Sequence, residues 1–229
     1  MFDNQPITHP IQKYILKTLT YHKYARFRDM RKPNTDSNLY SYHLKTVIKD
    51  GFVEKVAQGY RLTAKGLAYV DRLSQANFNF RIQPKIITMI LLKNTKSEIL
   101  LTQRNKQPFI TRWTLPSGKI HVEDEHIVEA AQRELNEKIG FAAKASQLSH
   151  IGDAYIHVRA DGAIISCVLA HIFAVKVKGG FSRDNIVWTN GKWRQQHKLA
   201  TAVEDIIKLS KTAKTPFFTE LKYDIDLNE

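Results

Sequence analysis

The sequence predicts an α+β chain of two folded parts: a small helical domain with a β-hairpin, and a larger α/β part built as an α/β/α sandwich around a mixed sheet. The 229 residues fit one large domain or two small ones. Apolar residues make up 43% of the chain and aromatic residues 10%, which is enough for a buried core and excludes global disorder. Helical spacing of apolar residues dominates the first third, whereas strand-forming runs follow residue 85.

The boundary between the two parts is predicted in the stretch Ser74–Pro84, SQANFNFRIQP, which follows a helical pattern and precedes a run of strand formers. Pro84 disfavours helix at the residue before it. We therefore expect a domain at 1–75, a linker at 76–84 and a second domain at 85–229.

The first domain is predicted to contain three helices, a hairpin and a closing helix. Apolar residues repeat at helical spacing in the first and third helices, and Gly51 is a suitable residue to end the third. The closing helix should direct its apolar residues inward. The expected elements are helices over 11–19, 26–30, 37–50 and 65–73, a hairpin of 53–56 and 60–63 around 57–59, and Leu67, Val70 and Leu73 as the inward residues of the last helix.

Helix, turn, helix and hairpin is the order of a winged helix-turn-helix, and the stretch Leu39–Gly66 resembles bacterial winged-helix regulators. Residues 1–80 carry 13 Lys+Arg against 6 Asp+Glu, a net charge of +7 that suits double-stranded DNA. The resemblance implies that the third helix enters the major groove. The alternative is the solvated face of a dimerisation or protein-interaction module. The DNA contacts implied are Asn38, Ser41, Tyr42, Lys45 and Lys49 on the helix and Arg61 on the hairpin.

The second domain is predicted to alternate strands with two amphipathic helices. Strands on both sides of one helix, with a second helix near the end, favour helices on both faces of a mixed sheet. The expected strands are 85–92, 97–103, 151–157, 164–177 and 186–188, and the expected helices are 125–139 and 197–210.

The segment from Trp113 to Phe141, WTLPSGKIHVEDEHIVEAAQRELNEKIGF, carries the most specific pattern in the chain. It resembles the Nudix box, whose family pattern is GX5EX7REUXEEXGU with U apolar. Many fixed spacings agree at once, so this resemblance is much stronger than a lone glycine motif. The matching box residues are Gly118, Glu125, Arg133, Glu134, Glu137 and Gly140.

Two of the box glutamates lie on one helix face. Glu134 and Glu137 are three residues apart, so their carboxylates project together and can hold a hard cation through oxygen. The resemblance implies that they bind Mg²⁺ or Mn²⁺ together with the backbone of Ser117 and Gly118, and that Arg133 orients them. In this family the metal activates water, and the substrate is a nucleoside diphosphate linked to another moiety. The implied catalytic residues are therefore Glu134, Glu137 and Arg133.

Spacing along the helix predicts two further features of this site. Arg133 follows Glu129 by four residues, and Glu129 follows Glu125 by four, so we expect a ladder of charges along the helix. We also expect Glu134 to be partly exposed at a cleft. The alternative is an ordinary solvated, salt-bridged helix face, because acidic residues near a helix start are favourable without any metal.

The box departs from the family pattern at three places. Ser117 replaces the usual glycine, and six residues rather than five separate Gly118 from Glu125. Lys138 stands where the family has a second paired glutamate, and at i+4 it competes with metal for the carboxylate of Glu134. Because of these departures, and of Lys138 above all, catalysis and ligand binding without catalysis remain alternatives for this box.

Several residues outside the box remain candidates. A further metal-binding acid is sought among Asp153, Asp161 and Asp184, without a choice between them. Histidines at 121 and 126 flank the box, as phosphate contacts or as surface residues, and each tryptophan is a base-stacking or a core residue. The only cysteine is expected to be a small buried hydrophobe, which fits a reducing cytosol. These last residues are His121, His126, Trp113, Trp188, Trp193 and Cys167.

The sequence thus supports two functions. One is a Mg²⁺-dependent hydrolase of a nucleoside diphosphate derivative with an appended DNA-binding domain. The other is a transcription regulator that senses such a nucleotide through a weakened box, and a third, weaker alternative is an interaction scaffold. The net charge of +13, the short apolar runs and the absence of a signal-peptide pattern predict a cytoplasmic protein with double-stranded DNA and a nucleotide as partners, no membrane, and a homodimer as an open possibility.

Overall fold

The computed structural model describes residues 7–74, 78–80, 82–181, 183–190 and 197–226. Contacts between Cα atoms divide the chain into two compact units, Met1–Ile82 and Gln83–Glu229. Within the described ranges, no helix combines the length and the apolar character needed to cross a bilayer. Trp193, one of the candidate stacking residues, lies outside the described residues.

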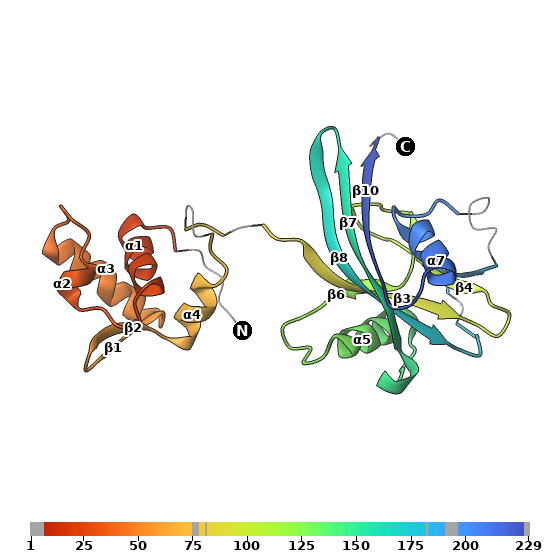
Figure 1. The fold of residues 1–229 in the computed structure, drawn as a ribbon, viewed down its shortest axis with the longest axis horizontal. Coiled ribbons are helices and arrows are strands. Elements are labelled where there is room, and N and C mark those ends of the chain that lie inside the picture. Colours follow the sequence, from red (N-terminus) through yellow and green to blue (C-terminus); the bar gives the residue numbers. More distant parts are fainter. Residues whose placement is uncertain (1–6, 75–77, 81, 182, 191–196, 227–229) are drawn as a thin grey trace. The chain divides into compact units, whose positions relative to one another are not determined.

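The first unit contains three helices, a two-stranded hairpin and a fourth helix, in the order predicted for a winged helix-turn-helix (Figure 1). The third helix begins after Asp36, whose carboxylate accepts hydrogen bonds from the backbone N–H groups of Asn38 and Leu39 at 2.9 Å. The elements are α1 Pro10–Thr20, α2 Phe27–Met30, α3 Ser37–Lys49, β1 Val53–Val56, β2 Gly59–Leu62 and α4 Ala64–Val70.

The last helix of this unit packs differently from the prediction. Leu67 was expected to face inward, but 57% of it is exposed. Gly66 is the buried residue of α4, and a Cβ atom at this position would lie 2.1 Å from the carbonyl oxygen of Phe52. The helix therefore approaches the core through its glycine, which turns the neighbouring leucine outward.

The second unit is built on a sheet in the order β10-β7-β8-β3-β4-β5, with β6 paired to β3 and β9 paired to β4. β3 pairs with β8 and β10 pairs with β7 in parallel, and the other pairs are antiparallel, so the sheet is mixed. The strands are β3 Lys85–Lys93, β4 Ile99–Gln103, β5 Trp113–Thr114, β6 Ser117–Lys119, β7 Ser149–Ala160, β8 Ala163–Lys176, β9 Ile186–Thr189 and β10 Phe217–Ile225.

Two helices cover the two faces of this sheet, α5 Ile127–Ile139 and α7 Val203–Thr212 (Figure 1). Buried residues of α5 join a core cluster with Ile90 and Phe173. Buried residues of α7 join a second cluster with Met89 and Ile172. These two residues come directly before Ile90 and Phe173 in their strands, so their side chains point to the opposite face of the sheet. The predicted α/β/α sandwich with a mixed sheet is therefore confirmed.

Two elements at the C-terminal end differ from the prediction. α7 begins at Val203 instead of residue 197, because the backbone of 198–200 pairs with Trp113. The N–H of Trp113 donates to the carbonyl of Lys198, and the N–H of Ala200 donates to the carbonyl of Trp113. The sequence analysis also missed β10, in which charged residues alternate along an exposed edge strand beside β7.

Cys167 is only partly buried, so the expected small buried hydrophobe is wrong. It lies on β8, and its Sγ donates to the hydroxyl of Tyr155 on β7 at 3.2 Å. The reason is that this part of the β7–β8 face is half-exposed instead of covered by α5.

Candidate functional site

The box helix α5 is fixed at both ends by local hydrogen bonds. The N–H of His126, its N-cap, donates to the carboxylate of Glu129 at 3.3 Å. Gly140 ends the helix with a φ of 73°, a left-handed conformation that glycine adopts without strain. The helix starts at Ile127 instead of the predicted residue 125, which leaves Glu125 exposed in the preceding loop.

Arg133 is the centre of the charged network on this helix. Its Nη2 lies 2.7 Å from Oδ2 of Asp124 and its Nε 3.2 Å from Oδ1, so the two side chains form a fork. Its Nη1 donates to Oε1 of Glu134 at 3.0 Å, and its Nη2 also donates to the carbonyl of Lys119 at 3.0 Å. The hydrogen bond from Arg133 lowers the pKa of Asp124, and the same bond raises the pKa of Arg133.

The predicted ladder from Glu125 through Glu129 to Arg133 is therefore wrong, because the arginine turns back to Asp124 in the loop. The sequence held a signal for this. Five residues separate Gly118 from Asp124, which is the family spacing, whereas six separate Gly118 from Glu125. With Asp124 as the acidic residue of the pattern, the extra residue lies between this aspartate and Arg133 instead of between Gly118 and the acidic residue.

Glu134 is buried, with 5% of the residue exposed, and the expectation of a partly exposed carboxylate is wrong. It packs directly over Gly118 on β6, where a Cβ atom would lie 1.8 Å from Cδ and Oε1 of the glutamate. Only glycine allows this approach of helix to strand. Lys138 Nζ lies 3.6 Å from Oε2 of Glu134, as expected from their i,i+4 spacing.

These residues fit a Mg²⁺ ion poorly as they stand. Oε1 of Glu134 accepts a hydrogen bond from Arg133, and Oε2 faces the ammonium of Lys138. Glu137 is more open, since 57% of its side chain is exposed and its Oε1 lies 3.9 Å from Arg133 Nη1. A divalent cation would have to displace Lys138 to reach both carboxylates, because it takes oxygen ligands and is repelled by an ammonium.

The backbone ligands suggested by the box lie in regular structure instead of an open loop. Ser117 and Gly118 belong to β6, where they pair with Met89 and Thr88 of β3. The carbonyl of the next residue, Lys119, already accepts from Arg133. This pairing fixes the floor beneath Glu134 rigidly.

A row of polar side chains continues from this floor across the sheet. Thr88 pairs with Gly118 on one side and with His171 on the other, and His171 pairs with Asp153. The hydroxyl of Thr88 is buried and has no hydrogen-bond partner among the described residues. Ile90 and Phe173, two residues along the same strands, contact the α5 side of the sheet, so the row lies on that face.

Positive charges gather beside β6. Burial lowers the pKa of Lys85 at the start of β3, and the charges of Lys119 and Arg104 lower it further. Burial also lowers the pKa of Arg104. The sequence analysis missed this group, because its members come from three separate segments that only the sheet brings together.

Other candidates from the sequence lie apart from the box. Asp153 contacts two histidines of β7 and β8, Asp161 lies in the exposed turn between these strands, and Asp184 is exposed before β9. The ring of Trp113 packs 4.9 Å from that of His197, and the indole N–H of Trp188 donates to the carbonyl of Phe181. His121 and His126 are exposed beside the box.

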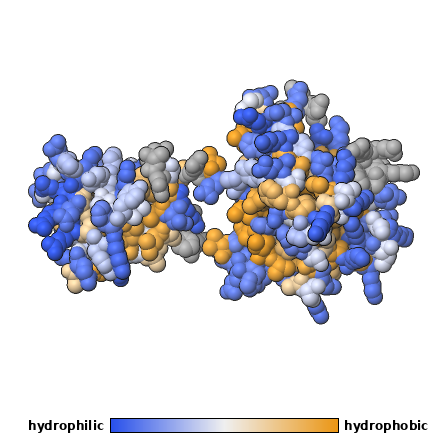
Figure 2. All heavy atoms as spheres, viewed as in Figure 1, coloured by the Kyte–Doolittle hydropathy of each residue, from blue (hydrophilic) through white to orange (hydrophobic). Residues whose placement is uncertain are grey.

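The residues predicted to face DNA lie on the outer face of α3. Asn38, Tyr42, Lys45 and Lys49 are exposed, and Ser41 is half-buried. Figure 2 shows mainly hydrophilic residues over the end of the unit where α2 and α3 lie.

The cations that can contact DNA differ from the predicted set at the hairpin and around α2. Arg61 on β2 is paired across the hairpin with Glu54, its Nε 2.7 Å from Oε1. The run RFRDMRK places four cations in seven residues, a signal that the sequence analysis did not use. They are exposed in and around α2: Arg26, Arg28, Arg31 and Lys32.

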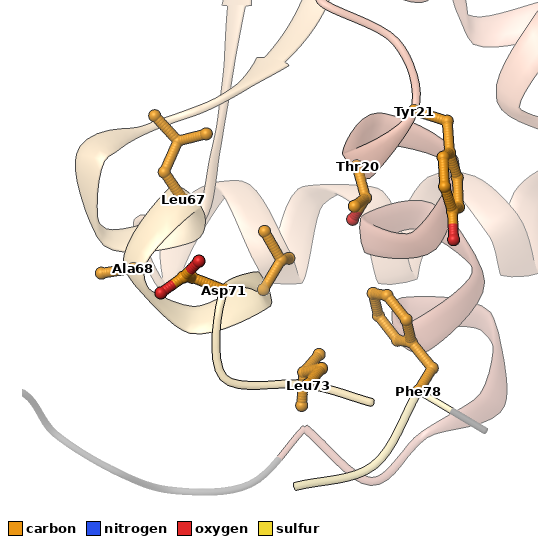
Figure 3. Close-up of a pocket in the computed structure, with 8 residues that line it drawn as sticks. Thr20, Tyr21, Leu67, Ala68, Asp71, Leu73 and Phe78 are labelled. Carbon is orange, nitrogen blue, oxygen red and sulfur yellow. The ribbon is translucent and has the colours of Figure 1, made fainter. Parts of the chain in front are cut away.

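A pocket of the first unit offers different chemistry (Figure 3). It lies between the end of α1 and α4, and Asp71 is the one charged residue that lines it among the described residues. An apolar wall with a single carboxylate does not suit a nucleotide, so this pocket is not the candidate site. Its lining residues are Thr20, Tyr21, Leu67, Ala68, Val70, Asp71, Leu73 and Phe78.

Comparisons with known proteins agree with this fold. The NUDIX domain family model matches residues 83–193. The solved NUDIX domain of Shewanella oneidensis NrtR, complexed with ADP ribose, aligns with a TM-score of 0.50 and 16% identity over 66% of this chain and 97% of that one. A search of curated proteins finds no match.

Two further solved structures align less closely. The MutT protein from Bacillus halodurans aligns with a TM-score of 0.46 and 18% identity over 63% of this chain and 92% of that one. Shewanella oneidensis NrtR complexed with a 27mer DNA aligns with a TM-score of 0.44 and 18% identity over 55% of this chain and 59% of that one. The chain therefore carries a NUDIX domain at residues 83–193.

Proposed function

We propose that this protein is a DNA-binding regulator whose Nudix domain binds a nucleoside diphosphate derivative without cleaving it at an ordinary enzyme rate. The observation that carries the proposal is the position of Lys138, whose ammonium lies 3.6 Å from the buried carboxylate of Glu134. With Arg133 on the other oxygen, the carboxylate is neutralised by two cations before any metal arrives. A site arranged in this way favours binding over metal-dependent hydrolysis.

The ligand is assigned by charge. Lys85 lies near Arg104 and near Lys119 of the box strand β6, and the anionic diphosphate of a nucleotide derivative would offset the mutual repulsion of these cations. Strand alternation puts Lys85 and Lys119 on the face of the sheet opposite α5. ADP ribose is a suitable probe of this class, because the NrtR domain that aligns with this unit is complexed with it. Binding is measured by calorimetry with and without Mg²⁺, and we expect binding in both conditions.

DNA binding is assigned to the first unit. Exposed residues at positions 38, 42, 45 and 49 recur at helical spacing on α3, so they form one stripe along the helix. The cations around α2 lie just before this helix, at the end that begins with the Asp36 cap. Such a stripe suits the major groove, with flanking cations on phosphates.

The experiment combines both units in the full chain. Duplexes selected by the protein from a random pool are labelled, and fluorescence anisotropy is followed while ADP ribose and related nucleoside diphosphates are added. The proposal predicts retention of DNA at low salt and a ligand-dependent change in affinity. Retention that no ligand of this class alters would remove the sensing function, and absence of retention would leave a protein-interaction module.

Two lysines of α3 give a sharper test of the DNA interface. Removing both Lys45 and Lys49 by substitution with glutamine should flatten the slope of log affinity against log salt by roughly two units, about one per lost phosphate contact. The matched control removes the same charge at Lys17 and Lys23, which are exposed outside α3. An equal effect in both double variants would show that only net charge matters.

Mg²⁺-dependent hydrolysis of the same ligand class is the second candidate function. It is favoured by the retained Arg133 and by Glu134 and Glu137 on one helix face. The test is product formation from a panel of nucleoside diphosphate derivatives with Mg²⁺ or Mn²⁺. Turnover of about 1 s⁻¹ or faster, within the usual enzyme range, would make this the primary function.

A further inference from the structure

Two histidines and an aspartate of the second unit converge on one point outside the Nudix box. Asp153 Oδ1 lies 2.7 Å from Nδ1 of His171 and 3.0 Å from Nε2 of His150. One ligand atom from each of the three residues lies within 4.8 Å of the others. Their side chains are 20–37% exposed, so an ion from solvent can reach them.

A β-bulge builds this cluster. Residues three apart in a regular strand face opposite sides of the sheet, so His150 and Asp153 should not meet. The register of β7 against β8 shifts between His150 and Gly152, which makes Ile151 an extra residue. The shift brings both side chains to the same face, where the His150 ring also packs 5.6 Å from the ring of Phe173. The convergence is thus fixed by the strand and does not depend on a loop.

The donor set selects a class of metal. Two imidazole nitrogens and one carboxylate oxygen suit Zn²⁺ and neighbouring transition metals, whereas Mg²⁺ prefers oxygen ligands. Nitrogen and oxygen ligands of a tetrahedral Zn²⁺ ion lie about 3.4 Å apart, given bonds of roughly 2.1 Å. The observed separations of 2.7 and 3.0 Å therefore need to open by about 0.7 and about 0.4 Å.

This cluster is distinct from the box carboxylates but shares their face of the sheet. His171 and Gly118 both pair with Thr88, so two strand spacings, about 10 Å, separate the backbone at His171 from the floor beneath Glu134. An ion held there would face the same side as the box helix α5.

We propose that His150, Asp153 and His171 bind a divalent transition-metal ion of the Zn²⁺ class, with a fourth position open to water or an anion. A metal ion binds neutral imidazole and ionised carboxylate, so acid weakens metal binding at a site of this kind. This binding does not depend on whether the box binds or cleaves a nucleotide.

The test is a titration of the metal-free full chain with Co²⁺, read by its visible absorption, and with Zn²⁺, read by calorimetry. Asparagine at position 171 and glutamine at position 150 place an amide nitrogen near the lost ring nitrogen, so the His171→Asn and His150→Gln variants keep a donor to Asp153. Each variant should bind the metal at least about 10-fold more weakly, because removal of even an outer partner of a metal ligand lowers metal affinity about 10-fold to 100-fold. The matched control is His157→Asn, four residues beyond Asp153 on β7.

A second measurement needs no variant. In the parent protein, Zn²⁺ should protect His150 and His171, but not His157, from acylation by diethyl pyrocarbonate, as read by mass spectrometry. Glu134→Gln should leave the Co²⁺ signal intact, which separates this site from the box. Unchanged affinity in the two ligand variants, or equal acylation with and without Zn²⁺, would overturn the proposal.

Discussion

Replacing Lys138 by glutamate tests whether its ammonium is what weakens the Nudix box. The ammonium of Lys138 lies 3.6 Å from Oε2 of Glu134, and the Coulomb attraction between the two charges is about 4–5 kcal/mol at an effective dielectric constant of 20. Because 39% of the lysine side chain is exposed, solvent screening reduces this to about 1 kcal/mol. The new carboxylate adds a repulsion of similar size and places a negative charge in the last helical turn.

Without metal, Lys138→Glu should therefore destabilise the second unit by about 2 kcal/mol, which corresponds to roughly 4–8 °C in melting temperature for a domain of this size. With Mg²⁺ the additional oxygen ligand should tighten metal binding, so the ion should raise the melting temperature more in the variant than in the parent. The assay is a pair of melting curves for each protein, recorded with and without about 10 mM Mg²⁺.

The matched control is Lys222→Glu, the same charge change at an exposed position of β10 on the edge of the sheet. It should show neither the loss of stability nor the response to metal. If Lys138→Glu gains no response to Mg²⁺, the lysine is not what excludes the metal. If the parent hydrolyses a nucleotide and Lys138→Glu slows it, the lysine is a working part of the site.

Two further substitutions probe the network around Arg133. Asp124→Asn should cost about 2–3 kcal/mol at neutral pH, because it removes the negative charge and one of the two acceptor oxygens of the fork, whereas Glu125→Gln, one residue on, should be nearly neutral. Since Arg133 lowers the pKa of Asp124 in the folded state, this stability is complete above the unfolded pKa of about 3.9 and is lost as the pH falls through the lower folded pKa. Melting curves of parent and Asp124→Asn should thus converge at acid pH, and a difference that persists there would refute the pairing. Glu134→Gln should abolish any response to Mg²⁺ and, because the carboxylate is buried between two cations, should also lower the melting temperature; full stability in this variant would contradict the burial.

The fold was predictable where the sequence carries a strong period or an obligatory residue. The spacing of α3 with its Asp36 cap, and the box helix with its Gly140 end, are both local signals. β10 was not predictable, because its alternating charges are explained only by its place as an edge strand beside β7. The start of α7 was misplaced because a pairing with Trp113, far along the chain, outweighs local helix preference.

The site was predictable in its residue types but not in its contacts. Spacing along a helix correctly brought Lys138 to Glu134, since i,i+4 neighbours are fixed by helix geometry. It could not show that Gly118 lets β6 lie against the carboxylate and bury it. The cluster at Asp153 was out of reach, because the bulge that creates it leaves no periodic mark in the sequence.

The most direct test of the proposed function follows DNA and ligand in one sample. The full chain, its selected duplex, Mg²⁺ and a panel of nucleoside diphosphate derivatives that includes ADP ribose are mixed, with anisotropy and chromatography recorded together. We predict that a ligand of this class changes DNA affinity while it remains chemically intact over many minutes. Cleavage at an ordinary enzyme rate of about 1 s⁻¹ or faster, with DNA affinity unaltered by every ligand, would contradict the account.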